Sequence, residues 1–184
     1  MPLTQKEISK LFVNSASMKN YSFPGIMPIG ITGFEVFLAI APILKGRKYW
    51  QALRNSYIMS DNLYEYRIDV RMAFMSTESD RISLMTKKEV REFEKLPEMV
   101  KIYRGASIEE EENDDYGISW TLSLEQAHYF AFVYPRNVAT HDHEKSIYER
   151  VVPKSKLLAY FKERGEEEVI YIENENWINF EDAN

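Results

Sequence analysis

The chain has 184 residues, of which 45% are hydrophobic and 14% aromatic, enough to build a substantial folded core. Its formal net charge of −6 argues against a general nucleic-acid-binding protein, which usually has a basic face. The absence of cysteine excludes disulfides, cysteine-ligated zinc and thiol catalysis.

The sequence predicts neither export nor membrane insertion. Its first residues have neither the basic block nor the apolar block of a secretory signal. The longest apolar run, residues 31–44, contains Glu35 and is too short to span a bilayer. We therefore expect a cytoplasmic protein with no membrane partner.

The first half of the chain has the spacing of helices. We expect a short polar helix in residues 1–22, a loop in 23–30, where Pro and Gly recur, and a buried helix in 31–44. Between Tyr49 and Phe74 apolar side chains recur every three or four residues, which is helical spacing.

A further helix is predicted before Pro97. Thr86 and Glu89 have the spacing of a capping box, in which each side chain bonds to the backbone N–H of the other residue. Nothing in residues 1–99 by itself has the pattern of a chemical site. We interpret residues 1–97 as a helical lobe.

After Pro97 the pattern changes to short apolar runs typical of strands. We expect strands in residues 99–104, 118–122, 147–152, 157–161, 169–172 and 177–180. Ser123 and Gln126 have capping-box spacing and predict one helix among them. Residues 109–115 contain six acidic side chains in seven positions and predict a solvated loop, because packed like charges repel. Helices followed by strands predict an α+β fold in one domain, residues 1–184.

Three polar motifs lie on the predicted strands. Residues 103–105 (Tyr-Arg-Gly) end the first strand, and residues 119–121 (Ser-Trp-Thr) lie on the second. Glu166, Glu167 and Glu168 run into an apolar strand, and alternation predicts that Glu166 and Glu168 share one face. Such a pair is either a solvated strand end or a site for a positively charged reactant.

The ordered set of motifs resembles the Arg–Ser–Glu class of mono-ADP-ribosyltransferases, which includes arginine-modifying bacterial toxins and several phage enzymes. That class has an aromatic–Arg pair near a strand end, a Ser-x-Ser/Thr strand followed by a helix, and Glu-x-Glu before an apolar strand. The resemblance covers about residues 97–180. It implies a helical lobe (1–97) and a split, mainly antiparallel β core (98–184) that binds NAD.

The resemblance implies a set of cofactor-binding residues. A planar guanidinium can hold a pyrophosphate through two parallel hydrogen bonds, and this role falls to Arg104. Gly105, beside Tyr103, is implied to let the nicotinamide amide reach main-chain groups, and Phe130 to present its ring to the nicotinamide. Without a cofactor, Arg104 is interpreted as a surface arginine, Gly105 as a turn glycine and Phe130 as a core aromatic. The tyrosine that closes the site in toxin relatives has three candidates in the helical lobe: Tyr57, Tyr64 and Tyr66.

The resemblance also implies the catalytic residues. Cleavage of the nicotinamide–ribose bond passes through an oxocarbenium-like state, which a carboxylate stabilises. This role falls to Glu168, with Ser119 donating a hydrogen bond to it and Thr121 supporting the same site. Glu166 is implied to orient an arginine acceptor, because family enzymes with Glu at this place modify arginine. Trp120 is expected in the core.

The implied reaction transfers ADP-ribose from NAD to a protein arginine, releases nicotinamide and needs no metal. The implied setting is a phage or bacterial effector acting on host or defence proteins, in the host cytoplasm if it is phage-encoded. The alternatives are an NAD glycohydrolase, a transferase acting on nucleic acid, and a non-catalytic binding protein that retains the fold. Residues 141–144 (His-Asp-His-Glu) have metal-ligand side chains but no third ligand at usable spacing, and predict a polar loop.

Overall fold

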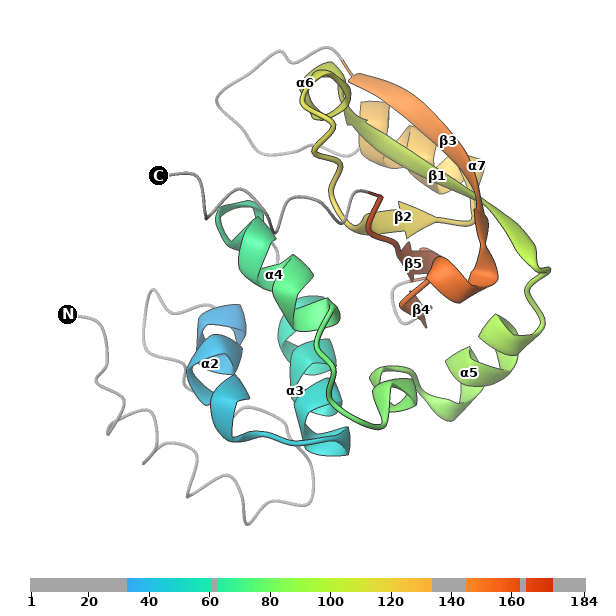
Figure 1. Ribbon diagram of the computed structural model, residues 1–184. Coiled ribbons are helices and arrows are strands. Elements are labelled where there is room, and N and C mark those ends of the chain that lie inside the picture. Colours follow the sequence, from blue (N-terminus) through green and yellow to red (C-terminus); the bar gives the residue numbers. More distant parts are fainter. Residues whose placement is uncertain (1–32, 61–62, 134–144, 163–164, 174–184) are drawn as a thin grey trace. The chain divides into compact units, whose positions relative to one another are not determined.

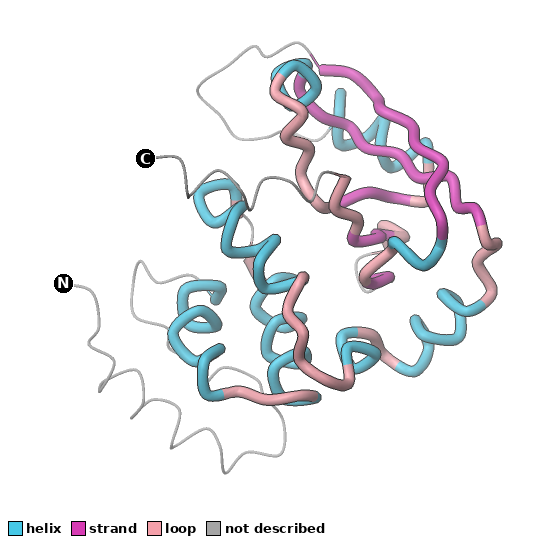
Figure 2. The backbone as a smooth tube through the Cα atoms, in the orientation of Figure 1, coloured by secondary structure: helices cyan, strands magenta, loops and turns pink. Residues whose placement is uncertain are grey.

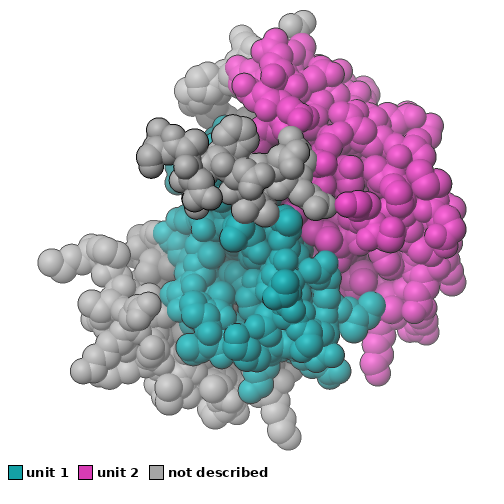
Figure 3. Space-filling view, viewed as in Figure 1, with its two compact units in different colours: residues 1–84 teal, residues 85–184 magenta. Residues whose placement is uncertain are grey.

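The computed structural model describes residues 33–60, 63–133, 145–162 and 165–173. The chain forms two compact units, residues 1–84 and 85–184 (Figure 3). None of the helices described in them is long and apolar enough to cross a membrane. Four segments with sequence predictions lie outside the described residues: 1–22, 23–30, 141–144 and 177–180.

The first unit is helical (Figure 1). Its elements are α2 (Gly33–Ile40), a 3-10 turn (Ala41–Ile43), α3 (Arg47–Ile58), a 3-10 turn (Tyr64–Tyr66), α4 (Arg67–Phe74) and a 3-10 turn (Arg81–Leu84). The buried helix predicted within residues 31–44 is confirmed as α2. The helical spacing between Tyr49 and Phe74 belongs to two helices, α3 and α4.

Aromatic side chains form the core of the first unit. Phe37 is fully buried and meets the ring of Tyr49 edge-on at 5.3 Å, and Tyr49 meets Trp50 at 5.0 Å. The buried indole Nε1 of Trp50 donates to the carbonyl of Ser79 at 2.8 Å. Arg54 is buried, and its Nη1 donates to the carbonyl of Leu84 at 2.8 Å.

The second unit is built on a five-stranded antiparallel sheet with the strand order β3-β1-β2-β5-β4 (Figure 2). Its strands are β1 (Met99–Ser107), β2 (Ser119–Thr121), β3 (Lys145–Pro153), β4 (Ala159–Phe161) and β5 (Glu168–Ile170). Its helical elements are α5 (Lys87–Glu94), α6 (Ile108–Glu112), α7 (Leu124–His128), a π-helical turn (Tyr129–Val133) and a 3-10 turn (Lys154–Lys156). The mixture of helices and an antiparallel sheet agrees with the predicted α+β class.

Strand register separates two faces of the sheet. A row of paired residues crosses all five strands and consists of Glu149, Tyr103, Thr121, Glu168 and Phe161. Paired residues in a sheet point to the same face, so these five side chains share one face. Trp120 lies between Ser119 and Thr121 in β2 and therefore points to the opposite face.

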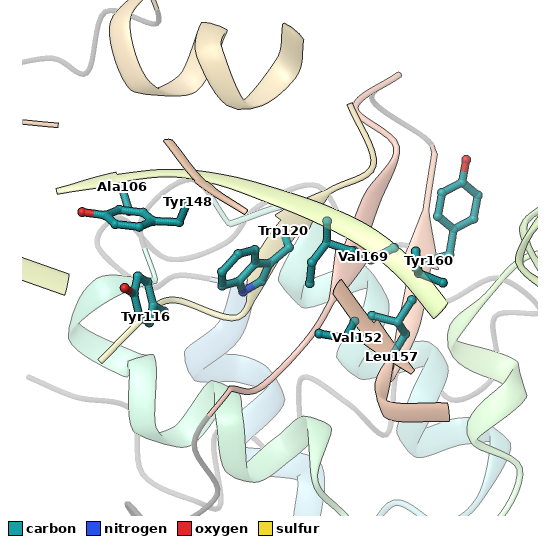
Figure 4. Close-up of a cluster of buried hydrophobic side chains, with 10 residues drawn as sticks. Ala106, Tyr116, Trp120, Tyr148, Val152, Leu157, Tyr160 and Val169 are labelled. Carbon is teal, nitrogen blue, oxygen red and sulfur yellow. The ribbon is translucent and has the colours of Figure 1, made fainter. Parts of the chain in front are cut away.

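The core of the second unit includes that opposite face. Trp120 is 1% exposed and lies beside Tyr116, with 5.9 Å between the ring centres (Figure 4). On another side it meets the ring of Tyr171 at 5.8 Å. The aliphatic residues of the same cluster are Val100, Ile102, Ala106, Val152, Leu157 and Val169. The prediction that Trp120 is a core residue is confirmed.

Both helices with predicted caps begin where the sequence indicated. Thr86 Oγ1 accepts from Glu89 N at 3.3 Å, and Glu89 Oε2 accepts from Thr86 N at 2.8 Å, which completes the capping box of α5. The second carboxylate oxygen of Glu89 accepts from Lys162 N at 2.9 Å, which ties α5 to the end of β4. Helix α7 begins after Ser123, whose hydroxyl accepts from Gln126 N at 3.3 Å.

The solvated loop predicted for residues 109–115 is partly wrong, because Ile108–Glu112 form the short helix α6. Two effects offset the repulsion between its acidic side chains. Glu110 forms an ion pair with Arg104, with 2.8 Å between Oε2 and Nη2. Acidic side chains in the first turn also interact favourably with the positive end of the helix dipole. Glu111 and Glu112 are exposed, as predicted.

Candidate active site

A hydrogen bond joins Ser119 of β2 to Glu168 of β5. Ser119 pairs directly with Ile170, so Glu168 is its diagonal neighbour on the same face of the sheet. Ser119 Oγ donates to Glu168 Oε1 at 2.6 Å, a length typical of a hydroxyl bound to a charged carboxylate. The hydrogen bond expected between these two residues is therefore present, and it fixes the direction of the carboxylate.

Arg104 contacts the same strand. Its Nη1 donates to the carbonyl of Ser119 at 2.6 Å, while Nε and Nη2 lie 2.9 and 2.8 Å from Glu110 Oε2. The Arg104 side chain is only 15% exposed, so it is not a solvated surface arginine. Arg104 is thus linked to Ser119 through a backbone carbonyl, but alternation after Tyr103 places its side chain on the face of the sheet opposite to Ser119 Oγ and Glu168.

Two residues around Arg104 were missed by the sequence interpretation. Gly117 lies against the guanidinium: a Cβ at this position would be 2.3 Å from Nη2 and 2.8 Å from Cζ of Arg104. The N–H of Gly117 donates to Glu110 Oε2 at 2.9 Å. Nothing in the local pattern indicates these contacts, because Gly117 precedes a strand as many turn glycines do and Glu110 is one of four consecutive glutamates.

The expected strand alternation of Glu166 and Glu168 is wrong. Strand β5 begins only at Glu168, and the preceding residues form a turn in which Gly165 has φ 77° and Glu167 has φ 49°. A left-handed residue breaks the two-residue repeat of a strand, so Glu166 and Glu168 are not related by alternation. Such a conformation costs on the order of 1–3 kcal/mol for a residue other than glycine and is often found at functional sites.

Strand β2 anchors this turn. Thr121 Oγ1 donates to the carbonyl of Glu166 at 2.7 Å and accepts from Ser123 N at 3.1 Å. Leu122 N donates to the carbonyl of Glu167 at 3.1 Å. Because Thr121 also pairs with Glu168, one residue supports both the turn and the start of β5.

Lys162 lies between helix α5 and the turn. Its Nζ is 3.0 Å from Glu92 Oε2 and 3.4 Å from Glu167 Oε1. The hydrogen bond to Glu92 raises the pKa of Lys162 and lowers the pKa of the Glu92 carboxyl. Glu167, which the sequence assigns to solvent, is partly exposed and lies beside this ammonium group.

Gly105 lies within β1 and not at its end, because the strand continues to Ser107. The space beside its Cα is filled: a Cβ would be 2.4 Å from the carbonyl oxygen of Ala127 and 2.8 Å from Ala131 N. Its missing side chain therefore allows α7 and the π-helical turn to pack on β1. Contact between its main-chain groups and nicotinamide stays a prediction.

Aromatic candidates lie in both units. Phe130 is half-buried on the π-helical turn, with its ring 5.6 Å from that of Tyr129, and Tyr103 is half-buried on β1. In the first unit, Tyr57 packs edge-on against Phe74 at 5.1 Å. Tyr66 donates to Glu35 Oε1 at 2.6 Å, and Tyr64 is 71% exposed with the guanidinium of Arg67 over its ring.

Within the described ranges, no group of three or more His, Asp or Glu side chains is arranged to hold a metal ion. Comparison of the chain with protein-family models, with curated proteins and with solved structures gives no match. Its function therefore has to be inferred from the motifs and from the contacts within the second unit.

Proposed function

We propose that the chain is a mono-ADP-ribosyltransferase that transfers ADP-ribose from NAD to a protein arginine and releases nicotinamide. The observation that carries this proposal is the 2.6 Å hydrogen bond from Ser119 Oγ to Glu168 Oε1. Arg104 adds support, because its guanidinium bonds to the carbonyl of the same serine at 2.6 Å. The proposed fold is of the ADP-ribosyltransferase type, with helices before an antiparallel sheet and the three motifs in the order of that class.

The proposed chemistry centres on Glu168. The glycosidic bond of NAD breaks, nicotinamide leaves with the bonding electron pair, and positive charge develops on the ribose ring. A fixed carboxylate beside the ring stabilises this charge without having to reorient during the reaction. Ser119 holds Glu168 in that position, and Arg104 binds the diphosphate of NAD.

Glu166 is the proposed acceptor-binding residue. Its backbone is fixed by Thr121, with 2.7 Å between the threonine hydroxyl and the Glu166 carbonyl oxygen. A carboxylate held there can pair with the guanidinium of a target arginine. A guanidinium nitrogen then attacks the ribose carbon and loses a proton as the new C–N bond forms. On the basis of the resemblance, we propose host or defence proteins as the targets.

The test is an assay of labelled NAD with a small guanidine acceptor and with cell lysate. We expect Glu166→Gln to lose transfer while NAD hydrolysis persists, and Glu167→Gln to retain both. Glu167 is a matched control because the same substitution is made one residue away, at a carboxylate that contacts Lys162.

Other outcomes favour the alternatives. Nicotinamide release without labelling of any acceptor would support an NAD glycohydrolase, and label on DNA or RNA would support a nucleic-acid transferase. If the wild-type protein releases no nicotinamide, the proposal is wrong and a non-catalytic binding protein is favoured.

A further inference from the structure

One oxygen atom of Glu110 contacts three nitrogen atoms of a compact anion site, two of them through hydrogen bonds. Oε2 lies 2.9 Å from Nε of Arg104, 2.8 Å from Nη2 of Arg104 and 2.9 Å from the backbone N of Gly117. Both side chains are largely shielded from solvent, at 15% exposure for Arg104 and 21% for Glu110. The site therefore consists of one edge of a guanidinium and one main-chain N–H, and it holds a single anionic oxygen.

The same groups suit a phosphate oxygen. A guanidinium edge together with a backbone amide is a frequent arrangement for binding phosphate, because both groups are donors. Gly117 lets the Arg104 guanidinium lie close to its backbone N–H, since a Cβ there would be 2.3 Å from Nη2. The remaining bond of Arg104, from Nη1 to the Ser119 carbonyl at 2.6 Å, does not involve Glu110. Arg104 can thus stay in place when the carboxylate leaves.

We propose that Glu110 is an internal competitor for this anion site, and that a diphosphate binds to Arg104 and Gly117 by displacing it. The identification of this diphosphate with that of NAD rests on the proposed function. The displacement of the Glu110 carboxylate by a diphosphate does not rest on it. In the structure, the Glu110 carboxylate occupies the anion site, and we call this arrangement the closed state.

The element that carries Glu110 is suited to move. Helix α6 has only five residues, and Glu109, Glu111 and Glu112 on it are exposed. Four consecutive negative charges repel one another, and those near the end of the helix face its negative dipole end. The ion pair of Glu110 with Arg104 offsets part of this repulsion. The competing anion therefore has to replace the contacts of one carboxylate oxygen with Arg104 and Gly117.

The competition lowers the apparent affinity for the ligand. When the binding-competent state is only a fraction of the population, the measured dissociation constant rises by the inverse of that fraction. If the closed state is favoured by about ten to one, removal of the Glu110 charge tightens diphosphate binding by about tenfold. If Glu110 were instead a structural support that orients Arg104, its removal would weaken binding. Glu110 as a competitor and Glu110 as a structural support therefore predict opposite changes in diphosphate affinity when its charge is removed.

The experiment measures binding of inorganic pyrophosphate and of NAD to the full chain by calorimetry. The variants are Glu110→Gln, whose amide oxygen can still accept from Gly117, and Glu110→Asp, which keeps the charge on a shorter side chain. The matched control is Glu112→Gln, which removes the same charge from an exposed position of the same helix. Thermal unfolding of each variant establishes that it is folded.

We expect Glu110→Gln to bind pyrophosphate about tenfold tighter than the wild type, and Glu112→Gln to stay within about twofold. Glu110→Asp should fall between them. Pyrophosphate binding that is unchanged, weaker or undetectable in both folded Glu110 variants overturns the proposal, as does equal tightening by Glu112→Gln. If Glu110→Gln tightens pyrophosphate binding but no form of the protein cleaves NAD, the competition is real and the proposed function is wrong.

Discussion

At the scale of single residues, the hydroxyl of Ser119 is the best-defined part of the candidate site. It donates to Oε1 of Glu168 at 2.6 Å, and the two residues are 49 positions apart in sequence. The same serine contacts Arg104 through its carbonyl. Its side chain and backbone thus orient two groups that the proposed reaction uses.

Substitution of Ser119 tests its role as a positioning residue. We expect Ser119→Ala to lower kcat for nicotinamide release by about tenfold to a hundredfold with a small change in KM, because a misplaced catalytic carboxylate affects the chemical step more than binding. Ser119→Thr keeps the hydroxyl and should recover most of the rate. Steady-state kinetics of the two variants checks this, and equal losses of rate in both would argue against hydrogen bonding as the cause.

The contact between Ser119 and Glu168 was predictable only through the resemblance to the Arg–Ser–Glu class. Alternation gives the direction of a side chain in its strand, but it does not say which strands are neighbours. Glu110 and Gly117 were not predictable, because their importance depends on where the Arg104 side chain ends after folding. The left-handed conformation of Glu167 was hidden for a related reason, since three consecutive glutamates carry no turn signal.

At the scale of elements, the close contact between β1 and the segment of α7 and the π-helical turn depends on Gly105. The carbonyl of Ala127 and the N of Ala131 occupy the space where a side chain would begin. These are backbone atoms and cannot rotate away. This packing determines how Phe130 is presented, since Phe130 adjoins Ala131 on the π-helical turn.

Alanine substitutions at Gly105 and Gly165 test this packing. We expect Gly105→Ala to lower the free energy of unfolding by about 1–3 kcal/mol or more through overpacking. Gly165→Ala has open space around it but a φ of 77°, so its cost should be about 1 kcal/mol from backbone strain alone. Chemical denaturation gives both values, and a smaller loss for Gly105→Ala than for Gly165→Ala would contradict the packing described.

At the scale of the whole molecule, the succession of elements was the most predictable feature. Capping residues, helical spacing and apolar runs identified the helices and strands in the described part of the second unit, except for α6. Strand pairing was not predictable from these patterns, because the order β3-β1-β2-β5-β4 depends on contacts between distant segments. The sheet links the three polar motifs only through that order, with β2 between β1 and β5.

Buried tyrosines make the stability of the folded protein depend on pH in the alkaline range. Burial raises the pKa of Tyr148 to about 12 from an ordinary value of 10.0, and the nearby Glu111 carboxylate adds to the effect. Burial also raises the pKa of Tyr116. Because the folded state keeps the proton that the unfolded state loses, this stabilisation is fully present below pH 10 and is lost as pH rises towards 12.

We expect the free energy of unfolding to fall above about pH 10 and the steepest part of that fall to be smaller in Tyr148→Phe. Denaturant titrations at increasing pH measure the stability, and ultraviolet absorbance of tyrosinate follows ionisation. A wild-type protein whose tyrosines all ionise near their ordinary pKa while the chain is still folded would show that Tyr148 is not shielded in this way.

The most direct test of the proposed enzyme is the rate of nicotinamide release from NAD by the wild-type protein, by Glu168→Gln and by Glu167→Gln. The two variants remove one charge each at neighbouring positions, but only Glu168 accepts the hydrogen bond of Ser119 at 2.6 Å. We predict release by the wild type, similar release by Glu167→Gln, and a loss of about a hundredfold or more in Glu168→Gln, the order reported for removal of a single group that stabilises transition-state charge. Equal rates for a folded Glu168→Gln and the wild type would contradict the catalytic role of Glu168.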